Sequence, residues 1–293
     1  MKRKTRESIY TLNMLAPWIV TFSVFWLYPL IYAGYLSLTK YGSLSGEATF
    51  IGFKNYINLM SDSAFWNALK VTSIFTIGTV PITTAVALAL AALLDSSTTK
   101  FKDFFRASYF TPSVTSIVVI ALIFTNLYAR EGYVNLILKT LGFAGSERGF
   151  LLETGTALPS IMAMDVWMSA GYYMALFLAG MQTIPRTLYD SASLAGANAW
   201  QRFFRITLPM LKPTLLFVLV INTIKSFQIF VEVFVMTKGG PLGSTTTLVY
   251  YVFVNAFEKT DMIGYASAAA WVLFIILLVL SFIQIKLLNV SSR

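Results

Sequence analysis

Six stretches of the chain, each of about 20 residues or more, consist almost entirely of apolar side chains. A helix of this length and composition crosses the hydrocarbon core of a bilayer, because it satisfies its backbone hydrogen bonds internally. The pattern therefore predicts an all-α integral membrane protein with six transmembrane helices. The expected spans are Met14–Leu38, Val71–Leu94, Ala107–Tyr128, Ala157–Met181, Thr214–Met236 and Tyr265–Ile285.

The composition agrees with a membrane protein and excludes several classes of enzyme. Hydrophobic residues make up 57% of the 293 residues and charged residues only 12%, whereas a soluble domain has about 25% charged residues. The sequence has no Cys and no His, which excludes disulfides, thiolate or imidazole metal sites and a Ser-His-Asp triad. It also contains no G-x-x-x-x-G-K-[ST] loop, the usual requirement for binding and hydrolysing ATP.

The net charge of +9 is explained by the side of the membrane on which each charge falls. If the N-terminus is on the inner side of six spans, the inner segments hold thirteen Lys and Arg residues and four acidic residues. The outer loops then hold eight Lys and Arg residues and seven acidic residues. This is the positive-inside pattern. We therefore expect a multi-pass membrane protein with both termini in the cytoplasm and a first span retained as an anchor. The basic balance then no longer indicates a nucleic-acid partner.

The polar connection between the fourth and fifth expected spans, residues 184–213, differs from the other loops. It is longer than a plain connector, and its apolar residues recur at helical spacing in two runs. Gly196 falls between the runs, where a helix C-terminus commonly needs a positive φ. We expect Pro209 to end the second run and Pro213 to occupy the first turn of the next span. The pattern predicts an amphipathic helix–turn–helix on the cytoplasmic surface.

This loop carries a motif of fixed spacing. It reads Asp190-Ser191-Ala192, three residues, Gly196, nine residues, Ile206, one residue, Leu208-Pro209. The permease subunits of binding-protein-dependent ABC importers have Glu-Ala-Ala, three residues, Gly, nine residues, Ile, one residue, Leu-Pro on a cytoplasmic loop. The chain resembles this family with every spacing kept; Asp190 stands in place of the usual Glu and Ser191 in place of an Ala.

Four further segments are similar to the carbohydrate branch of the same family. They are Phe50–Thr72, Phe104–Val114, Asp165–Pro185 and Val233–Phe257. The resemblance implies an ABC type I importer permease core over residues 67–293, preceded at 1–66 by the cytoplasmic N-terminus, the first span and an outer segment. It points to the half of the permease pair related to the larger subunit of maltose-type importers.

The resemblance also implies how such a subunit works. It would be a non-catalytic permease of the bacterial inner membrane that carries a sugar or oligosaccharide. Its partners would be a second homologous permease, an ATPase dimer, an extracytoplasmic sugar-binding protein and membrane lipid. ATP and Mg would bind to the ATPase, with no cofactor in this chain. The loop would dock on the ATPase through a coupling helix, and the implied coupling residues are Asp190, Ser191, Ala192, Gly196, Arg202, Ile206, Leu208 and Pro209. For Arg202 and Arg205, a plain positive-inside charge is the alternative.

Three ionisable residues fall inside expected spans, where each costs about 2.5–3.5 kcal/mol. Asp165 lies in the fourth span, while Lys225 and Glu232 lie in the fifth, seven residues apart and so on one helical face. One interpretation is that these polar residues line a cavity that binds sugar hydroxyls. The alternative is that an Asp165–Lys225 ion pair and interhelical hydrogen bonds hold the bundle together. The candidates for the substrate path, including rings for the apolar side of a sugar, are Asp165, Trp167, Tyr172, Asn222, Lys225, Phe227, Gln228 and Glu232, with Tyr173 as a further ring.

Two other classes of membrane protein are alternatives to an ABC permease. A secondary transporter or channel driven by an ion gradient would need inverted repeats, broken helices in corresponding halves or a relay of buried acids, and none of these is evident in the sequence. A membrane-embedded enzyme would need a nucleophile–base pair or metal ligands, and the lack of His removes the commonest general base. The ion-driven transporter or channel is the alternative to the ABC permease.

Overall fold

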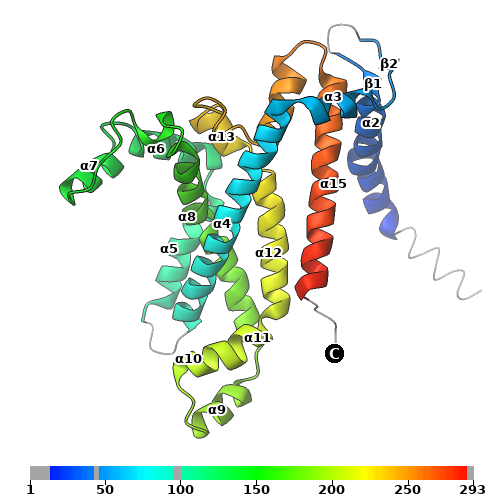
Figure 1. The fold of residues 1–293 in the computed structure, drawn as a ribbon. Helices are drawn as coiled ribbons and strands as arrows, with labels where there is room; N and C mark the ends of the chain where they lie inside the picture. The colour runs from blue at the N-terminus through cyan, green and yellow to red at the C-terminus, as the bar shows by residue number, and fades with distance from the viewer. Residues whose placement is uncertain (1–13, 43–45, 96–99, 289–293) are drawn as a thin grey trace, which may run out of the picture. The chain divides into compact units, whose positions relative to one another are not determined.

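The computed structural model describes residues 14–42, 46–95 and 100–288 (Figure 1). The N-terminal segment 1–13 and the C-terminal residues 289–293, both expected in the cytoplasm, lie outside the described residues. The chain divides into two units, the first made of Met1–Asp62 and Val252–Ile275 and the second of Ser63–Tyr251 and Ile276–Arg293. The division expected between residues 66 and 67 stays a prediction.

The first unit contains an apolar helix and a small folded segment that follows it. Its elements are the helix Met14–Ser37 with the π turn η1 (Ser23–Leu27) and α2 (Tyr28–Ser37), the paired strands β1 (Thr39–Lys40) and β2 (Thr49–Phe50), α3 (Lys54–Ser61), η4 (Val254–Glu258) and the first part of α15 (Ile263–Leu288). The buried Asn55 side chain donates to the carbonyl oxygens of Ser37 and Thr39 at 2.8 and 2.9 Å. These two bonds fix α3 to the end of α2 and to β1.

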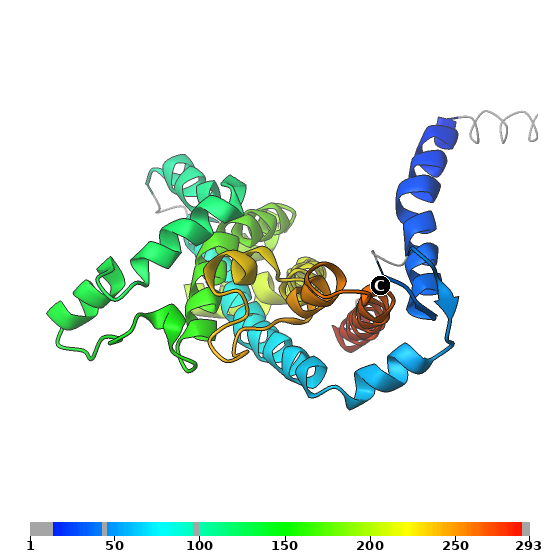
Figure 2. The same cartoon turned by 90° about the horizontal axis from the view of Figure 1, so that it is seen from above.

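The second unit is a helical bundle with α8 at its centre. Its elements are α4 (Ser63–Asp95), α5 (Lys102–Val114), α6 (Ile117–Leu127), α7 (Tyr133–Thr140), η2 (Phe150–Leu152), α8 (Ala157–Gln182), α9 (Arg186–Leu194), α10 (Ala199–Arg202), η3 (Phe203–Thr207), α11 (Leu208–Met210), α12 (Lys212–Phe227) and α13 (Val231–Met236), with most of α14 (Leu248–Phe253) and the end of α15. Helix α8 packs against α4, α5 and α12 (Figure 1 and Figure 2). Small residues on α4, such as Ala87 and Ala91, allow Tyr173 and Phe177 of α8 to be fully buried between the helices.

Five helices are long and apolar enough to cross a membrane, and a bent pair makes a sixth candidate span among the described residues. The five are Met14–Ser37, Ser63–Asp95, Ala157–Gln182, Lys212–Met236 and Ile263–Leu287. They contain or closely match five of the expected spans, so the all-α membrane architecture is confirmed.

The third expected span, Ala107–Tyr128, is not one straight helix. Helices α5 and α6 meet at an angle of 95°, and Thr115 between them is extended, with φ −81° and ψ 149°. Pro112 has no backbone N–H and so removes a hydrogen bond from the last turn of α5. The Ser113 hydroxyl donates to the carbonyl oxygen of Met168 at 2.8 Å, which fixes the end of α5 on α8.

The fifth expected span is also interrupted, which corrects the expectation of a continuous polar face from Lys225 to Glu232. Helix α12 ends at Phe227 and α13 starts at Val231, with Phe230 at a non-helical φ of −143°. The β-branched residues Ile229 and Val231 at this point favour a helix less than unbranched side chains do. The helices are thus broken in two places where the expected spans were continuous.

Candidate functional site

The helix–turn–helix expected after α8 is present as α9 and α10, and its turn explains part of the motif spacing. Gly196 has a φ of +79°. The Gly196 N–H donates to the Ser193 carbonyl oxygen at 3.0 Å, and the Ala197 N–H to the Ala192 carbonyl oxygen at 2.9 Å. These two bonds form the Schellman ending of a helix, in which the residue at positive φ is usually Gly. The motif therefore has Gly196 four residues after Ala192 because the Schellman ending requires this separation between the carbonyl group that accepts from Ala197 and the residue at positive φ.

The second helix of the loop starts with a reciprocal cap that the sequence analysis missed. The Asn198 side chain accepts from the Gln201 N–H, and the Gln201 side chain accepts from the Asn198 N–H, both at 2.9 Å. This is a capping box, and an Asn followed three residues later by a Gln was its signal in the sequence.

Pro209 does not end the second run as expected. The chain continues helically through the π turn η3 and then α11, as far as Met210. In the π turn the Leu208 N–H bonds to the Phe203 carbonyl oxygen, five residues back, and this places Pro209 in the first turn of α11, where its missing N–H is tolerated. Pro213 lies in the first turn of α12, as predicted.

Two side-chain hydrogen bonds brace the loop across its turn. The Arg202 guanidinium donates to the Ser193 hydroxyl at 2.8 Å, and the hydroxyls of Tyr189 and Thr207 lie 2.8 Å apart. Tyr189, Arg202 and Thr207 also border a cavity of about 780 Å³ behind the loop. Arg202, expected to contact the ATPase, thus has a partner within its own loop, and a role in docking stays a prediction.

The loop turns apolar side chains to its surface while its root is buried in the bundle. Leu194 is 92% and Trp200 71% exposed, and exposed apolar residues of this size gather at interaction surfaces. Ile184 and Leu211, at the two ends of the loop, belong to the core between α4, α8 and α12, and Ile206 of the motif packs against that core. Among the other motif residues, Asp190, Ser191 and Pro209 are exposed and Leu208 is half-buried. A displacement of the loop surface would therefore be transmitted to α8 and α12 through these packed residues.

Removing the Tyr189–Thr207 brace is expected to loosen the loop without unfolding the bundle. One lost hydrogen bond contributes about 1 kcal/mol, so Tyr189→Phe and Thr207→Val should each lower, by a few-fold, the sugar uptake that the resemblance to ABC importer permeases implies. Uptake assays of both single variants and of the double variant check this. The double variant should be no worse than the single ones, because the same bond is already lost; additive losses would contradict the brace.

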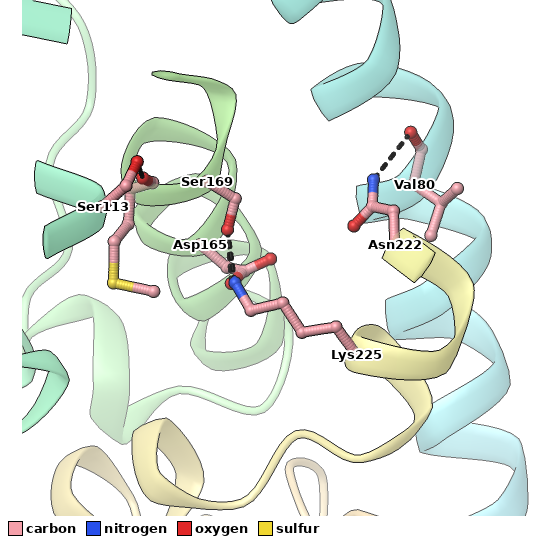
Figure 3. A network of polar contacts seen from close by, with 7 residues as sticks. Val80, Ser113, Asp165, Ser169, Asn222 and Lys225 are labelled. Atoms are coloured by element: carbon pink, nitrogen blue, oxygen red, sulfur yellow. Dashed lines mark hydrogen bonds and ion pairs between the residues drawn. The ribbon is translucent and has the colours of Figure 1, made fainter. Parts of the chain in front are cut away.

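A second polar cluster lies inside the bundle, where Lys225 of α12 meets α8 (Figure 3). The Lys225 Nζ lies 3.2 Å from the Asp165 Oδ1 and 2.5 Å from the Ser169 Oγ, and the Ser169 hydroxyl donates to the same Asp165 oxygen at 3.2 Å. The interhelical ion pair considered as an alternative is therefore formed. Ser169, which sequence analysis missed, lies one turn after Asp165, and this i, i+4 spacing was its signal.

A cavity of about 170 Å³ adjoins this cluster. Four of the eight candidate residues for the substrate path line it, namely Asp165, Lys225, Gln228 and Glu232. The break between α12 and α13 places Gln228 and Glu232 at this cavity, although Lys225 and Glu232 do not share a helical face. The geometry thus combines an interhelical ion pair with a polar cavity beside it.

The other four candidates are not part of the lining of this cavity. Trp167 is 51% exposed and packs on the Phe124 ring at 5.4 Å between centroids, and Tyr172 is 43% exposed. Asn222 is fully buried, and its amide is 3.5 Å from the Val80 carbonyl oxygen of α4 (Figure 3). Phe227 is buried. Their roles in the substrate path stay predictions.

The match to a known family covers most of the chain. Residues 86–290 match the model of the family described as the binding-protein-dependent transport system inner membrane component. The chain belongs to this family, and it is therefore an inner membrane permease component of an ABC transport system. The resemblance inferred from the loop motif is confirmed.

Similar proteins agree in sequence and fold. The lactose transport system permease protein of Rhizobium radiobacter is 36% identical over 287 residues, 96% of either chain. The arabinooligosaccharides transport system permease protein of Bacillus subtilis is 36% identical over 275 residues, 93% of this chain and 86% of the relative. A chain of the bacterial ABC transporter involved in the import of the acidic polysaccharide alginate has the same fold, with a TM-score of 0.82 over 99% of both chains at 23% identity. The expected type I importer fold is thereby confirmed.

Proposed function

We propose that this chain is the transmembrane subunit of an ATP-driven importer that carries a sugar or oligosaccharide across the inner membrane. The observation that carries this proposal is the exposed α9–α10 loop, which is built on the family motif and rooted in the same helices, α8 and α12, that hold the Asp165–Lys225 pair. The relatives named for lactose and arabinooligosaccharides support a sugar as the cargo.

The proposed transporter has further subunits. A second homologous permease completes the pathway, an ATPase dimer binds ATP and Mg and hydrolyses the nucleotide, and an extracytoplasmic protein delivers the sugar. The family description, which names a binding protein, supports the last of these. The sequence has no phosphate-binding loop of its own, so in this proposal the chain is not an enzyme and holds no cofactor.

In the membrane, the α9–α10 loop and both termini face the cytoplasm, and lipid surrounds the bundle. The excess of Lys and Arg on these segments supports this orientation. Closure of the ATPase dimer would press on the exposed face around Leu194 and Trp200. The buried residues Ile184 and Leu211 would pass this displacement to α8 and α12, and so change access to the cavity between them.

Uptake by the complete system tests the proposed function. Proteoliposomes containing this chain, its partner permease and the ATPase should take up a sugar only with ATP and the binding protein present, and a collapsed ion gradient should leave uptake unchanged. Liposomes with this chain alone should show neither uptake nor ATPase activity. Sugar uptake by the chain alone, driven by an ion gradient, would instead establish the secondary transporter.

A further inference from the structure

The charges that line the cavity between α8, α12 and α13 indicate which class of sugar it accepts. Two carboxylic acids, Asp165 and Glu232, and one amine, Lys225, border a space of about 170 Å³. Both acids are almost fully buried, at 3% and 4% exposure. We propose, on the basis of the proposed function, that this cavity binds an uncharged sugar ring and discriminates against sugars that carry a carboxylate, sulfonate or phosphate.

The first reason is that Lys225, the one cation that lines the cavity among the residues the structure describes, is already engaged. The Lys225 ammonium contacts Asp165 and Ser169, which use two of its three N–H donors and leave one for a ligand. One donor suits a sugar hydroxyl. An acidic group on the ligand would have to compete with the buried Asp165 for the ammonium, and displacing Asp165 would leave a buried carboxylate without its counter-charge, which is costly.

The second reason is the position of Glu232. The ion pairs found among the described residues do not include it. The carboxyl oxygens of Glu232 accept hydrogen bonds, so they match the hydroxyls of a neutral sugar, each of which has a proton to donate. An acidic sugar would bring its charge into a small space whose lining offers two acidic side chains and an ammonium that is already paired, and a buried charge without a counter-charge is costly by more than the free energy of a tenfold change in affinity.

The third reason is the size and walls of the cavity. At about 30 Å³ per water molecule, 170 Å³ holds about six waters, which is the scale of one sugar ring rather than of several. Phe75 and Phe230 form part of its lining and offer apolar surface to the C–H face of such a ring. The names of similar proteins leave the charge open, because lactose is neutral and alginate is acidic. For this chain, the lining of the cavity indicates a sugar without charge.

Weak binding by the assembled permease–ATPase complex, without the binding protein, is the direct test. Ligand-observed NMR compares two probes, methyl β-galactopyranoside and the matched methyl galactopyranosiduronate, in which a carboxylate replaces the CH₂OH group. The neutral probe should bind the wild type at least about tenfold more tightly than the acidic probe. Equal affinity for both probes would overturn the proposal.

Two variants identify the groups that discriminate. Glu232→Gln replaces an acid by an amide that can donate to a carboxylate and leaves the ion pair in place, and Asp165→Asn frees the Lys225 ammonium, so each should raise the affinity for the acidic probe by about tenfold. Glu131→Gln, in an exposed position away from the cavity, should keep the wild-type preference. An unchanged preference in both cavity variants, or binding of neither probe, would refute the assignment of this cavity, whereas sugar uptake by the complete system would still stand as the separate test of the proposed function.

Discussion

Replacing Gly196 by valine is expected to lower sugar uptake at least about tenfold while ATP hydrolysis by the assembled transporter continues. Gly196 has a φ of +79°, and a Cβ there would meet no atom within 4 Å. The cost is therefore conformational, about 1–3 kcal/mol for a residue that does not favour positive φ. The turn relieves this strain by moving α9 against α10, which displaces the exposed surface around Leu194 and Trp200. The ratio of sugar imported to ATP hydrolysed in proteoliposomes measures this uncoupling.

Two substitutions separate the backbone effect from the added side chain. Gly196→Asn should keep most of the coupling, because Asn adopts the left-handed conformation more easily than other residues. Gly155→Val adds the same side chain at another glycine whose Cβ would meet nothing within 4 Å, but without a positive φ, and it should transport normally. A wild-type ratio of uptake to hydrolysis in Gly196→Val would refute the role of this turn in coupling.

The loop could be predicted from the sequence because the interactions that shape it are local. The helix end at Gly196 involves the carbonyl oxygens of Ala192 and Ser193. The cap at Asn198 was missed, although it is equally local and involves Gln201, three residues away. Patterns over so few residues are legible without knowledge of the fold. Pro209 was misjudged because a π turn, which shifts one hydrogen bond by a single residue, has no distinct sequence pattern.

The cavity could be predicted only in part. Hydropathy over a window of about 20 residues identifies a span, but one or two non-helical residues, such as Thr115 or Phe230, leave that average unchanged. The buried charges were visible as exceptions in apolar segments. The Asp165–Lys225 pair was one of two alternatives, and the sequence did not decide between them because the two residues lie 60 positions apart in the chain. The place of Glu232 at the cavity could not be predicted, because it depends on the break between α12 and α13.

Gly171→Ala is expected to prevent stable packing of α5 on α8. A Cβ at Gly171 would overlap the carbonyl oxygen of Tyr109 and come within 3.0 Å of the Cα of Phe110. These are backbone atoms of α5, so no side chain can rotate away and the two helices must separate. Overpacking of this kind costs about 1–3 kcal/mol or more. The melting temperature and the yield of folded complex in detergent should both fall.

Gly78→Ala in α4 is the matched control, because the two substitutions share the same intrinsic effect on a helix. Alanine favours a helix over glycine by about 1 kcal/mol at either site, so propensity alone predicts that both variants gain stability. At Gly78 the new methyl group would lie 3.1 Å from the sulfur of Met162, a flexible side chain that adjusts, and the variant should be as stable as the wild type or slightly more so. Opposite signs for the two variants would show that the close approach of α5 to α8 requires a glycine; a stable Gly171→Ala protein would mean that the bundle tolerates a wider spacing there.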